Sequence, residues 1–447
     1  MRVLILGITA ALLSGCYCSH LASRFTFGDD AGRDGGVSPD ATGDAGGCPV
    51  CSQATPYCDP ATGRCVECLA NDHCDDGEPC TLDRCSLGTC SSALEPSCVV
   101  EVSAGELHTC AWRGDGRALC WGSNALGQLG DGTQTDRAVP TAVLELQDAR
   151  AVASGSVSTC ALRGTAVACW GDNGFGQLGD GTTLLRDRPV SVVGLSSAAS
   201  IGVGWDHACA VRTTGAVACW GRNQAGQLGD GSMDDRINPV AVQGISDALR
   251  VELGQTSSCV LRAAGRISCW GGNRDGQLGD GSTTGSPTAV EVAGLSDAVD
   301  LAVGDNHACA VRSGGTVVCW GDNARGQLGD GSTTDSPVAV SVAGLEDALE
   351  VVAGTSHTCA RTSSGAVMCW GWNINGQLGD GSTTDRHMPA AVQGLADAIG
   401  LTAAGNGHTC ARRSAASVVC WGANAMRQLG DGTSVGPRTT PVEVVGL

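Results

Sequence analysis

The sequence repeats itself with a period of about fifty residues, and this period constrains the fold more than any other feature. The tripeptide Cys-Trp-Gly occurs seven times, in steps of 49 to 51 residues, with its tryptophans at Trp121, Trp170, Trp220, Trp270, Trp320, Trp370 and Trp421. Around each copy lies the same frame: an apolar stretch ending in Gly, then xxHTCA, a polar turn, CWGxNxxGQLGDG, a variable linker and PxxVxGL. At 447 residues the chain is too long for one hydrophobic core, and repetition accounts for most of that length.

The apolar pieces of the frame are short, β-branched and bounded by Gly, Asp or Pro, and they show no helical period. They predict four antiparallel strands per repeat, which in the third repeat cover 200–204, 207–212, 216–221 and 239–242. Four strands repeated seven times predict an all-β fold, a seven-bladed β-propeller. The period alone also allows a kelch propeller or a solenoid. Kelch blades would carry tyrosines, but Tyr17 and Tyr57 both lie outside the repeats.

The frame GxxHTCA followed by CWGxNxxGQLGDG resembles the regulator of chromosome condensation repeat, and the resemblance covers residues 99–447. It implies a seven-bladed propeller. Ser158 and Ser257 depart from the pattern by replacing the histidine, and Arg427 replaces the glycine before Gln428.

Each repeat carries two cysteines that flank one predicted hairpin, where facing β-carbons can come close enough for a bridge. We therefore expect a disulfide within each blade; bridges between neighbouring blades are the alternative. The predicted pairs are Cys110 with Cys120, Cys160 with Cys169, Cys209 with Cys219, Cys259 with Cys269, Cys309 with Cys319, Cys359 with Cys369, and Cys410 with Cys420.

The N-terminus predicts export. Residues 1–15 combine Arg2 with an apolar run from Val3 to Leu13, which is typical of a signal peptide. The sequence Leu13-Ser14-Gly15-Cys16 resembles the bacterial lipobox, which implies lipidation of Cys16; an ordinary cleaved signal is the alternative. Tyr17 follows the cysteine where Asp would favour the inner membrane, so we expect an outer-membrane lipoprotein of the cell envelope, or otherwise a secreted protein. Residues 16–47 are rich in Gly, Asp and Ala and predict a flexible tether.

Residues 48–98 are too few and too rich in cysteine to fold around a hydrophobic core. Because disulfides persist outside the cytosol, ten cysteines here predict about five bridges whose connectivity is left open. A zinc site is the alternative, since Cys48/Cys51 and Cys65/Cys68 form two CxxC pairs near His73. Cys18 remains unassigned. The ten cysteines are Cys48, Cys51, Cys58, Cys65, Cys68, Cys74, Cys80, Cys85, Cys90 and Cys98.

Two repeated residues could suggest metal sites. One histidine per blade is spaced too far from the next to share an ion, so we expect each to make a turn-stabilising hydrogen bond instead. One aspartate per GQLGDG loop lacks the several oxygens that calcium requires, and a Gly-Asp-Gly turn explains it. No catalytic motif is present, so we expect no enzyme, no cofactor and no metal. The histidines are His108, His207, His307, His357 and His408; the aspartates are Asp131, Asp180, Asp230, Asp280, Asp330, Asp380 and Asp431.

Charge argues against nucleic acid as a partner. The net charge is −19 and all 27 basic residues are arginines, so the chain has no lysine-rich face for phosphates. The best-known member of the family that the repeat resembles is a nuclear exchange factor for the small GTPase Ran. Export, disulfides and acidity argue against that role here. We expect the membrane to be contacted only through the lipid anchor.

Function is sought where the repeats differ. The first-to-second and third-to-fourth strand connections emerge on one face of a blade, and both vary between repeats. Exposed Trp and Arg are enriched at binding hot spots, so we predict a protein-binding face on a monomer, with an unknown protein ligand. Three alternatives remain open: ordinary variable loops, a carbohydrate-processing or other propeller enzyme, and a structural adhesin without a discrete site. The predicted binding residues are Trp205, Asp206, Arg222, Arg274, Arg325 and Trp372.

Overall fold

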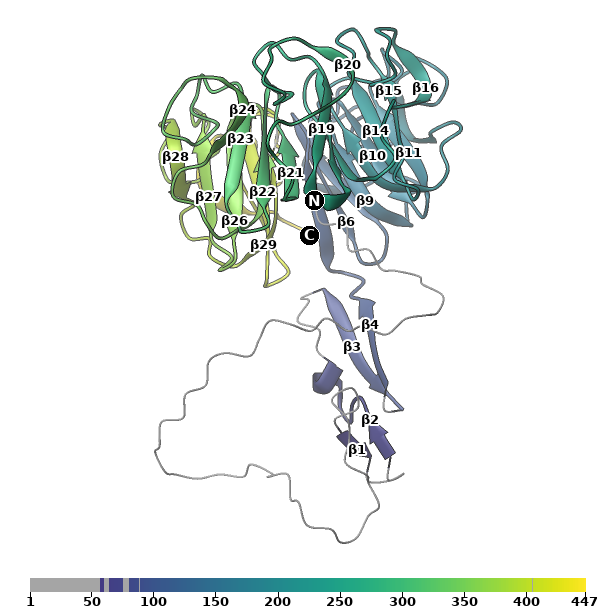
Figure 1. Cartoon of the computed structure of the whole chain (residues 1–447). Helices are drawn as coiled ribbons and strands as arrows, with labels where there is room; N and C mark the ends of the chain where they lie inside the picture. Colours follow the sequence, from purple (N-terminus) through teal and green to yellow (C-terminus); the bar gives the residue numbers. More distant parts are fainter. Residues whose placement is uncertain (1–56, 60–63, 75–79, 88, 404) are drawn as a thin grey trace. The chain divides into compact units, whose positions relative to one another are not determined.

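The computed structural model describes residues 57–59, 64–74, 80–87, 89–403 and 405–447 (Figure 1). The predicted signal peptide, the lipidation site Cys16 and the tether therefore lie outside the described residues. The described residues divide into two units: one holds residues 80–82 and those from 93 onward, and the other holds residues 57–59, 64–74 and the described part of 83–92. The helices of the described residues are two 3-10 turns, η1 (Asn71–Cys74) and η2 (Ala263–Gly265), and none is long and apolar enough to cross a membrane.

The cysteine-rich segment forms two small sheets, β1 (Tyr57–Asp59) with β2 (Arg64–Val66) and β3 (Thr81–Ser86) with β4 (Thr89–Leu94). Its described part contains three disulfides, as expected for exported chains: Cys68–Cys85, Cys74–Cys90 and Cys80–Cys98.

The zinc alternative finds no support in this segment. The sulfur atoms of Cys68, Cys74 and Cys90 lie within 4.8 Å of one another. All three are engaged in disulfides, and zinc binds thiolates. Cys48 and Cys51 lie outside the described residues.

Each repeat folds into one four-stranded antiparallel sheet built from consecutive strands, and we number these sheets blades 1 to 7. The strands are, in blade 1, β5 (Val99–Ala104), β6 (His108–Arg113), β7 (Ala118–Gly122) and β8 (Arg137–Ala142); in blade 2, β9 (Ala149–Ser154), β10 (Ser158–Arg163), β11 (Ala166–Gly171) and β12 (Arg186–Ser191); in blade 3, β13 (Ala198–Val203), β14 (His207–Arg212), β15 (Val217–Gly221) and β16 (Arg236–Ala241); in blade 4, β17 (Ala248–Leu253), β18 (Ser257–Arg262), β19 (Ile267–Gly271) and β20 (Ser286–Glu291); in blade 5, β21 (Ala298–Val303), β22 (His307–Arg312), β23 (Val317–Gly321) and β24 (Ser336–Ser341); in blade 6, β25 (Ala348–Ala353), β26 (His357–Thr362), β27 (Val367–Gly371) and β28 (Arg386–Ala391); and in blade 7, β29 (Ala398–Ala403), β30 (His408–Arg413), β31 (Val418–Gly422) and β32 (Arg438–Glu443).

The predicted all-β propeller is confirmed, with one correction to its outer strands. In blade 3 the fourth strand begins at Arg236, not at residue 239. The fourth strands, such as β16 and β28, lie at the outer edge of the propeller (Figure 1) and each contains a proline, which an edge strand tolerates. Because one side of an edge strand is unpaired and exposed, its first residues are polar and carry no apolar pattern to predict them.

The two cysteines of each blade are joined within that blade, as the sequence predicts, and not to a neighbouring blade. In blade 3 the paired residues Cys209 and Cys219 stand directly opposite each other on β14 and β15, with Cα atoms 4.0 Å apart.

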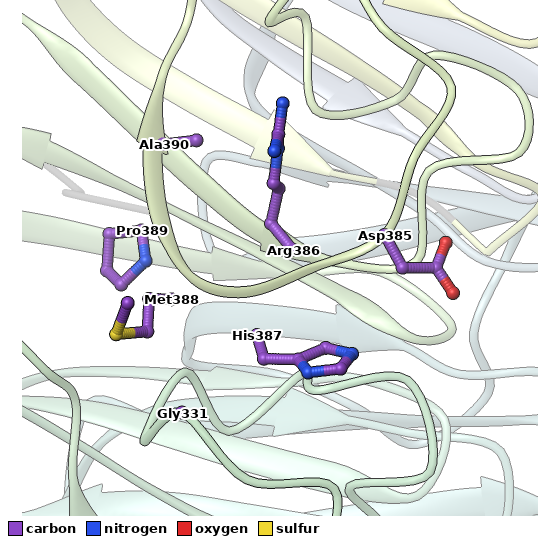
Figure 2. Close-up of a pocket in the computed structure, with 7 residues that line it drawn as sticks. All are labelled: Gly331, Asp385, Arg386, His387, Met388, Pro389 and Ala390. Atoms are coloured by element: carbon purple, nitrogen blue, oxygen red, sulfur yellow. The ribbon is translucent and has the colours of Figure 1, made fainter.

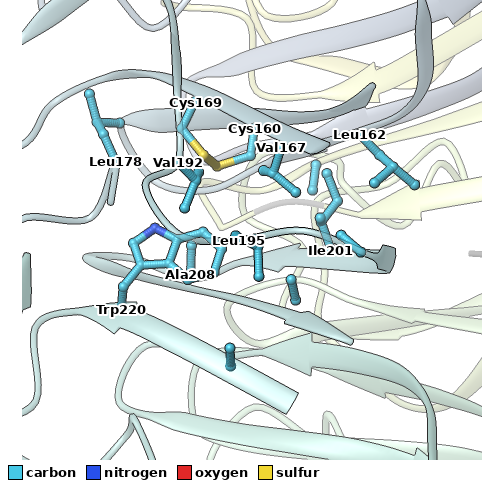
Figure 3. Packing of buried hydrophobic residues seen from close by; sticks show 14 of the residues in the cluster. Cys160, Leu162, Val167, Cys169, Leu178, Val192, Leu195, Ile201, Ala208 and Trp220 are labelled. Carbon is cyan, nitrogen blue, oxygen red and sulfur yellow. A yellow bond between two sulfur atoms is a disulfide. The ribbon is translucent and has the colours of Figure 1, made fainter. Parts of the chain in front are cut away.

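The hydrophobic core lies between the blades. Trp220 of blade 3 packs against the Cys160–Cys169 disulfide and Leu178 of blade 2 (Figure 3). Its Nε1 donates to the main-chain oxygen of Gln177 at 2.9 Å, and all seven frame tryptophans repeat this bond to the preceding blade. The frame tryptophans are therefore blade-packing residues, as predicted.

The ring closes by the same contacts. The first strands of neighbouring blades touch all the way round, including β29 of blade 7 against β5 of blade 1. Trp121 of blade 1 packs on Cys410 and Cys420 of blade 7. No strand is exchanged between the first and last repeats, so side-chain packing closes the ring.

Candidate functional site

The two variable connections of each blade lie side by side on one face of the propeller, which we call the loop face. In blade 3 the main-chain N–H of Arg222 donates to the main-chain oxygen of Asp206 at 2.9 Å. In blade 6 the main-chain N–H of Trp372 donates to the main-chain oxygen of Ser356 at 2.8 Å. We number loop positions from the first residue after Trp-Gly. Position 1 holds Ser123, Asp172, Arg222, Gly272, Asp322, Trp372 and Ala423; position 4 holds Leu126, Phe175, Ala225, Asp275, Arg325, Asn375 and Met426; position 6 holds the frame glutamines Gln128, Gln177, Gln227, Gln277, Gln327, Gln377 and Gln428.

The five frame histidines are fully buried and bind the next blade. Each hydroxyl they meet donates to a frame glutamine's main-chain oxygen, so the histidine Nε2 is the donor and the ring is neutral. Burial lowers the pKa of His307 to about 4 and those of the other four to about 3. We call each bond, 2.8–3.0 Å long, a histidine clasp: His108–Thr159, His207–Ser258, His307–Thr358, His357–Thr409 and His408–Thr109.

The clasps correct the expected role of the histidines. The sequence predicts a bond that stabilises the histidine's own turn, but the bond joins two blades. In blades 2 and 4, where Ser158 and Ser257 replace histidine, the facing positions of the next blades hold Ala208 and Ala308. Both partners have thus changed together, which removes the bond without leaving a buried ring donor unpaired. The 2/3 and 4/5 blade junctions therefore lack a clasp.

The aspartates of the GQLGDG loops are bound within their own loops. Asp131 accepts from the Thr133 hydroxyl at 2.7 Å, from Arg137 Nε at 2.8 Å and from Asn124 Nδ2 at 3.1 Å. Burial opposes ionisation, but the bonds from Thr133 and Arg137 outweigh it and lower the pKa of Asp131. The carboxylate is used to hold the loop, which agrees with the turn role predicted for it.

Trp205 reaches from blade 3 to blade 5. Its Nε1 donates to Asp305 Oδ1 at 3.0 Å, although blade 4 lies between these two blades in the ring. Burial raises the pKa of Asp305 to about 6; bonds from Thr355 and Trp205 oppose the rise, and Glu106 adds to it. Trp205 is therefore bound to another blade and is not a freely projecting side chain.

At the 2/3 junction, Arg222 covers an aromatic ring. Its guanidinium carbon lies 4.7 Å from the ring centroid of Phe175, in cation–π contact. The same guanidinium pairs with Asp206 at 3.1 Å and donates to Gln224 at 3.1 Å. Three neighbours therefore hold Arg222, and this junction is closed.

At the 5/6 junction the two loop positions exchange roles. Arg325 now stands at position 4 and Trp372 at position 1, with the guanidinium carbon 6.0 Å from the indole centroid. The Arg325 side chain is 54% exposed, and its carboxylate partner Asp385 is 3.5 Å away. Ile374 beside them is 60% exposed. The 5/6 junction is therefore more open than the 2/3 junction.

A pocket adjoins the 5/6 junction (Figure 2). It is lined by Asp385, His387 and Met388 at the start of β28, and Gly331 contributes from blade 5. Asp385 links this pocket to the loop face because it also pairs with Arg325.

Arg274 lies apart from both pairs, at loop position 3 of blade 4, and it is exposed. The residue after it, Asp275, meets Asp322 of blade 5. Burial and the charges of Asp322 and Asp335 raise the pKa of Asp275, while Arg274 lowers it. The 4/5 junction is thus acidic and holds no aromatic side chain.

The predicted binding residues therefore share a face but form no single cluster. The structure brings Asp206 to Arg222 and Arg325 to Trp372, and it leaves Trp205 and Arg274 separate. Sequence reasoning missed Phe175, Asp385 and Gln377. Phe175 could have been found from the sequence by pairing loop position 4 of each blade with loop position 1 of the next blade, which places Phe175 opposite Arg222.

Comparison with known proteins agrees with this architecture. Two family models, both described as the Regulator of chromosome condensation (RCC1) repeat, match the chain. One covers residues 115–162, 167–211, 214–261, 264–311, 314–361 and 364–412. The other covers 99–128, 198–227, 298–327 and 349–377. Together they span more than half of the chain.

Solved structures show the same fold at low identity. Yeast RCC1 (Prp20) bound to Kap60 is 19% identical, with a TM-score of 0.66, covering 73% of this chain and 83% of that one. Human WBSCR16 is 21% identical, with a TM-score of 0.67, covering 74% and 94% respectively. Prp20p from Saccharomyces cerevisiae is 19% identical, with a TM-score of 0.64, covering 78% and 88%. No curated protein matches the chain.

Proposed function

Because the chain belongs to the Regulator of chromosome condensation (RCC1) repeat family, we propose that it is a protein-binding scaffold, exported and held at the cell envelope by a lipid on Cys16. Its propeller supplies a rigid disc, and its loop face binds the partner. The partner is a protein, and the chain acts without chemistry of its own.

The division between frame and loop residues carries this proposal. The side chains of the frame tryptophans, histidines and aspartates, and the main-chain oxygens of the frame glutamines, are engaged in bonds within and between blades. The loop positions differ from blade to blade and keep exposed side chains such as Ile374 and Arg325. Varied exposed side chains on a rigid scaffold are the usual arrangement of a recognition surface.

The point at which the chain joins the propeller also favours the loop face. Strand β5 runs from Val99 towards the loop face, so Val99 lies at the opposite face. Just before it, Cys98 accepts from Gly114 at 3.0 Å and Pro96 accepts from Asp115 at 3.2 Å, at a hairpin turn of blade 1. The chain therefore enters the propeller on the face opposite the loop face.

The similar structures add support of a general kind. Yeast RCC1 (Prp20) was solved bound to Kap60, and Prp20p was described with its binding properties to Gsp1p and histones. Those partners belong to those proteins. They support only the general proposal that a propeller of this family recognises other proteins.

An enzyme is the second candidate, because two carboxylates, Asp305 and Glu106, are near enough for the charge of Glu106 to raise the pKa of Asp305. Asp305 is bound to Trp205, and Glu106 is bound to the Ser156 hydroxyl. Both acids are thus engaged with neighbouring side chains, which does not favour their use on a substrate.

The test uses the full chain purified from envelope membranes. We expect Cys16→Ala to release the protein from the membrane fraction. We also expect the immobilised protein to retain a saturable partner from envelope proteins, and substitutions on the loop face to reduce that retention. Retention that does not saturate would favour the adhesin instead, and retention unchanged by every loop-face substitution would exclude the proposed face.

A further inference from the structure

Gln377, at loop position 6 of blade 6, carries a buried amide that its neighbours leave unused. The side chain is fully buried, and its Nε2 has no hydrogen-bond acceptor among the described residues. Three other frame glutamines have an acceptor for Nε2, namely Gln177, Gln277 and Gln327. Nε2 of Gln128, Gln227 and Gln428 also has no acceptor among the described residues, but only the Nε2 of Gln377 is both fully buried and without one. Buried polar groups are nearly always satisfied, so an exception requires an explanation.

Equivalent glutamines show which acceptor this position takes. In blade 2, Gln177 Nε2 donates to Asp172 Oδ2 at 2.7 Å. In blade 5, Gln327 Nε2 donates to Asp322 Oδ2, also at 2.7 Å. In both blades the acceptor is a carboxylate at loop position 1. In two of the seven blades, therefore, this amide binds a carboxylate.

Blade 6 lacks this acceptor and also the substitute that blade 4 uses. Gln277 of blade 4 has Gly272 at loop position 1 and donates instead to Asn306 of the next blade at 3.4 Å. In blade 6 loop position 1 holds Trp372, and the counterpart of Asn306 is Gly407. A Cβ on Gly407 would lie only 3.0 Å from Gln377 Nε2, so the missing side chain would stand directly beside the amide.

The surroundings of Gln377 are rich in donors and apolar groups. No described residue accepts a hydrogen bond from Trp372 Nε1, in contrast to Trp205 and the frame tryptophans. The Arg325 guanidinium lies over the indole, with its nearest carboxylate 3.5 Å away. Ile374 adds an exposed apolar side chain. Donors around an apolar centre suit a ligand that carries a carboxylate next to an apolar group.

We propose that Arg325, Trp372, Ile374 and Gln377, which we call the 5/6 patch, bind an acidic segment of the partner protein. An Asp or Glu carboxylate of that segment occupies the place that Asp172 and Asp322 fill in their own blades. An apolar side chain beside it packs on Trp372 and Ile374. This inference rests on the proposed function and names the chemistry of its partner.

Binding requires a movement of the indole. Gln377 is fully buried, and Trp372 occupies loop position 1, from which Asp172 and Asp322 contact this amide in their own blades, so a carboxylate that takes their place requires the Trp372 side chain to rotate away. The cation–π contact with Arg325 is the one polar interaction that holds the indole among the described residues, and such contacts are weak at exposed sites. The rotation is therefore accessible.

The experiment is a peptide array probed with the full, oxidised chain. Randomised octapeptides are printed in two versions, one with a central Asp and one with a central Asn, and the strongest binders are measured by fluorescence anisotropy. We expect the Asp versions to bind at least tenfold more tightly, with Leu, Ile or Phe enriched beside the acid. Equal binding of the Asp and Asn versions, or no binding by either, overturns the proposal.

Trp372→Asp provides the sharpest variant, because it restores the residue that blades 2 and 5 carry. It should satisfy Gln377, leave the unfolding midpoint unchanged or raised, and weaken peptide binding at least tenfold. Gln224→Ala, at the same loop face in blade 3, is the matched control and should bind as the parent does. Undiminished binding by Trp372→Asp contradicts the proposal. If loop-face capture of a partner persists while the array fails, only this inference falls; if that capture fails, both fall.

Discussion

The 2/3 and 5/6 blade junctions each place an arginine and an aromatic ring at loop position 4 of one blade and loop position 1 of the next, but they differ in how exposed these side chains are. At the 2/3 junction Arg222 covers Phe175 and is held by Asp206 at 3.1 Å. At the 5/6 junction Arg325 is more exposed and Trp372 is the ring. One junction is closed by its loop residues, and the other leaves them available.

The buried layers beneath these two junctions also differ. The 2/3 junction lacks a histidine clasp because Ser158 faces Ala208, and the contact of Arg222 with Phe175 joins its two blades at the loop face. The 5/6 junction has the clasp of His307 to Thr358 at 2.9 Å. At the 5/6 junction, therefore, a buried bond joins the two blades beneath the exposed loop residues.

The largest expected effect is on the pH dependence of stability. The five buried histidines have folded pKa values of about 3 to 4, below the ordinary 6.5. Between those values the unfolded state binds more protons than the folded state, so stability is present above pH 6.5 and is lost as the pH falls. Each histidine contributes a loss of roughly 1.4 kcal/mol per pH unit. Glu101 and Asp305, whose pKa values burial raises to about 7 and about 6, offset part of this loss.

The pH dependence can be checked by giving the 5/6 junction the Ser and Ala residues that the 2/3 junction carries at positions 158 and 208. His307→Ser combined with Thr358→Ala removes one of the five histidines. Denaturant unfolding between pH 7 and pH 5 should show a shallower dependence on pH for the double variant than for the parent. Identical slopes would mean that His307 is protonated in the folded state.

The next effect compares single truncations in the buried layer. His307→Ala leaves a cavity and deprives Thr358 of its donor, so we expect a loss of about 3 kcal/mol in the free energy of unfolding. Ser158→Ala removes a hydroxyl that has no partner among the described residues and should cost less than about 0.5 kcal/mol. Denaturant titration at pH 7.5 measures both. Similar losses would show that the clasp contributes little.

The two aromatic rings should separate binding from stability. Trp372→Ala should weaken partner binding about thirtyfold, as a hot-spot residue does. Phe175→Ala should change binding less than about twofold and lower stability by about 1 kcal/mol, because it removes the ring beneath Arg222. Calorimetric titration and denaturant unfolding of the same two variants provide the comparison. The reverse outcome would place binding at the 2/3 junction.

The smallest expected effect concerns the arginine of the open junction. Arg325→Gln keeps a polar side chain of similar length but removes the charge, and it should weaken binding by about threefold. The difference from the parent should shrink at high salt, because exposed charges are screened. An effect that is independent of salt would show that Arg325 acts by packing alone.

Periodicity made the propeller predictable from the sequence. Seven copies of Cys-Trp-Gly fixed the number of blades, and the cysteine spacing gave the disulfides of the blades. The beginning of the fourth strands was not predictable, because edge residues such as Arg236 carry no apolar pattern.

The loop face was predictable only in part. Loop variability identified the face, but a variable residue does not show which residue of the next blade it meets. Trp205 is of the residue type that often anchors a binding partner, yet its indole is bound to Asp305 of blade 5. Gln377 belongs to an invariant part of the frame and attracts attention only when its missing acceptor is seen in space. The paired change of Ser158 with Ala208 was visible in the sequence and required only a knowledge of which blades touch.

Site-specific photo-crosslinking tests the contrast between the two junctions most directly. A photoreactive amino acid replaces Ile374 in one variant and Gln224, at the same loop position of blade 3, in the other, and both are irradiated in the native envelope. The account predicts a discrete partner adduct from position 374 and none from position 224. An adduct from position 224 alone, or equal adducts from both, would contradict it.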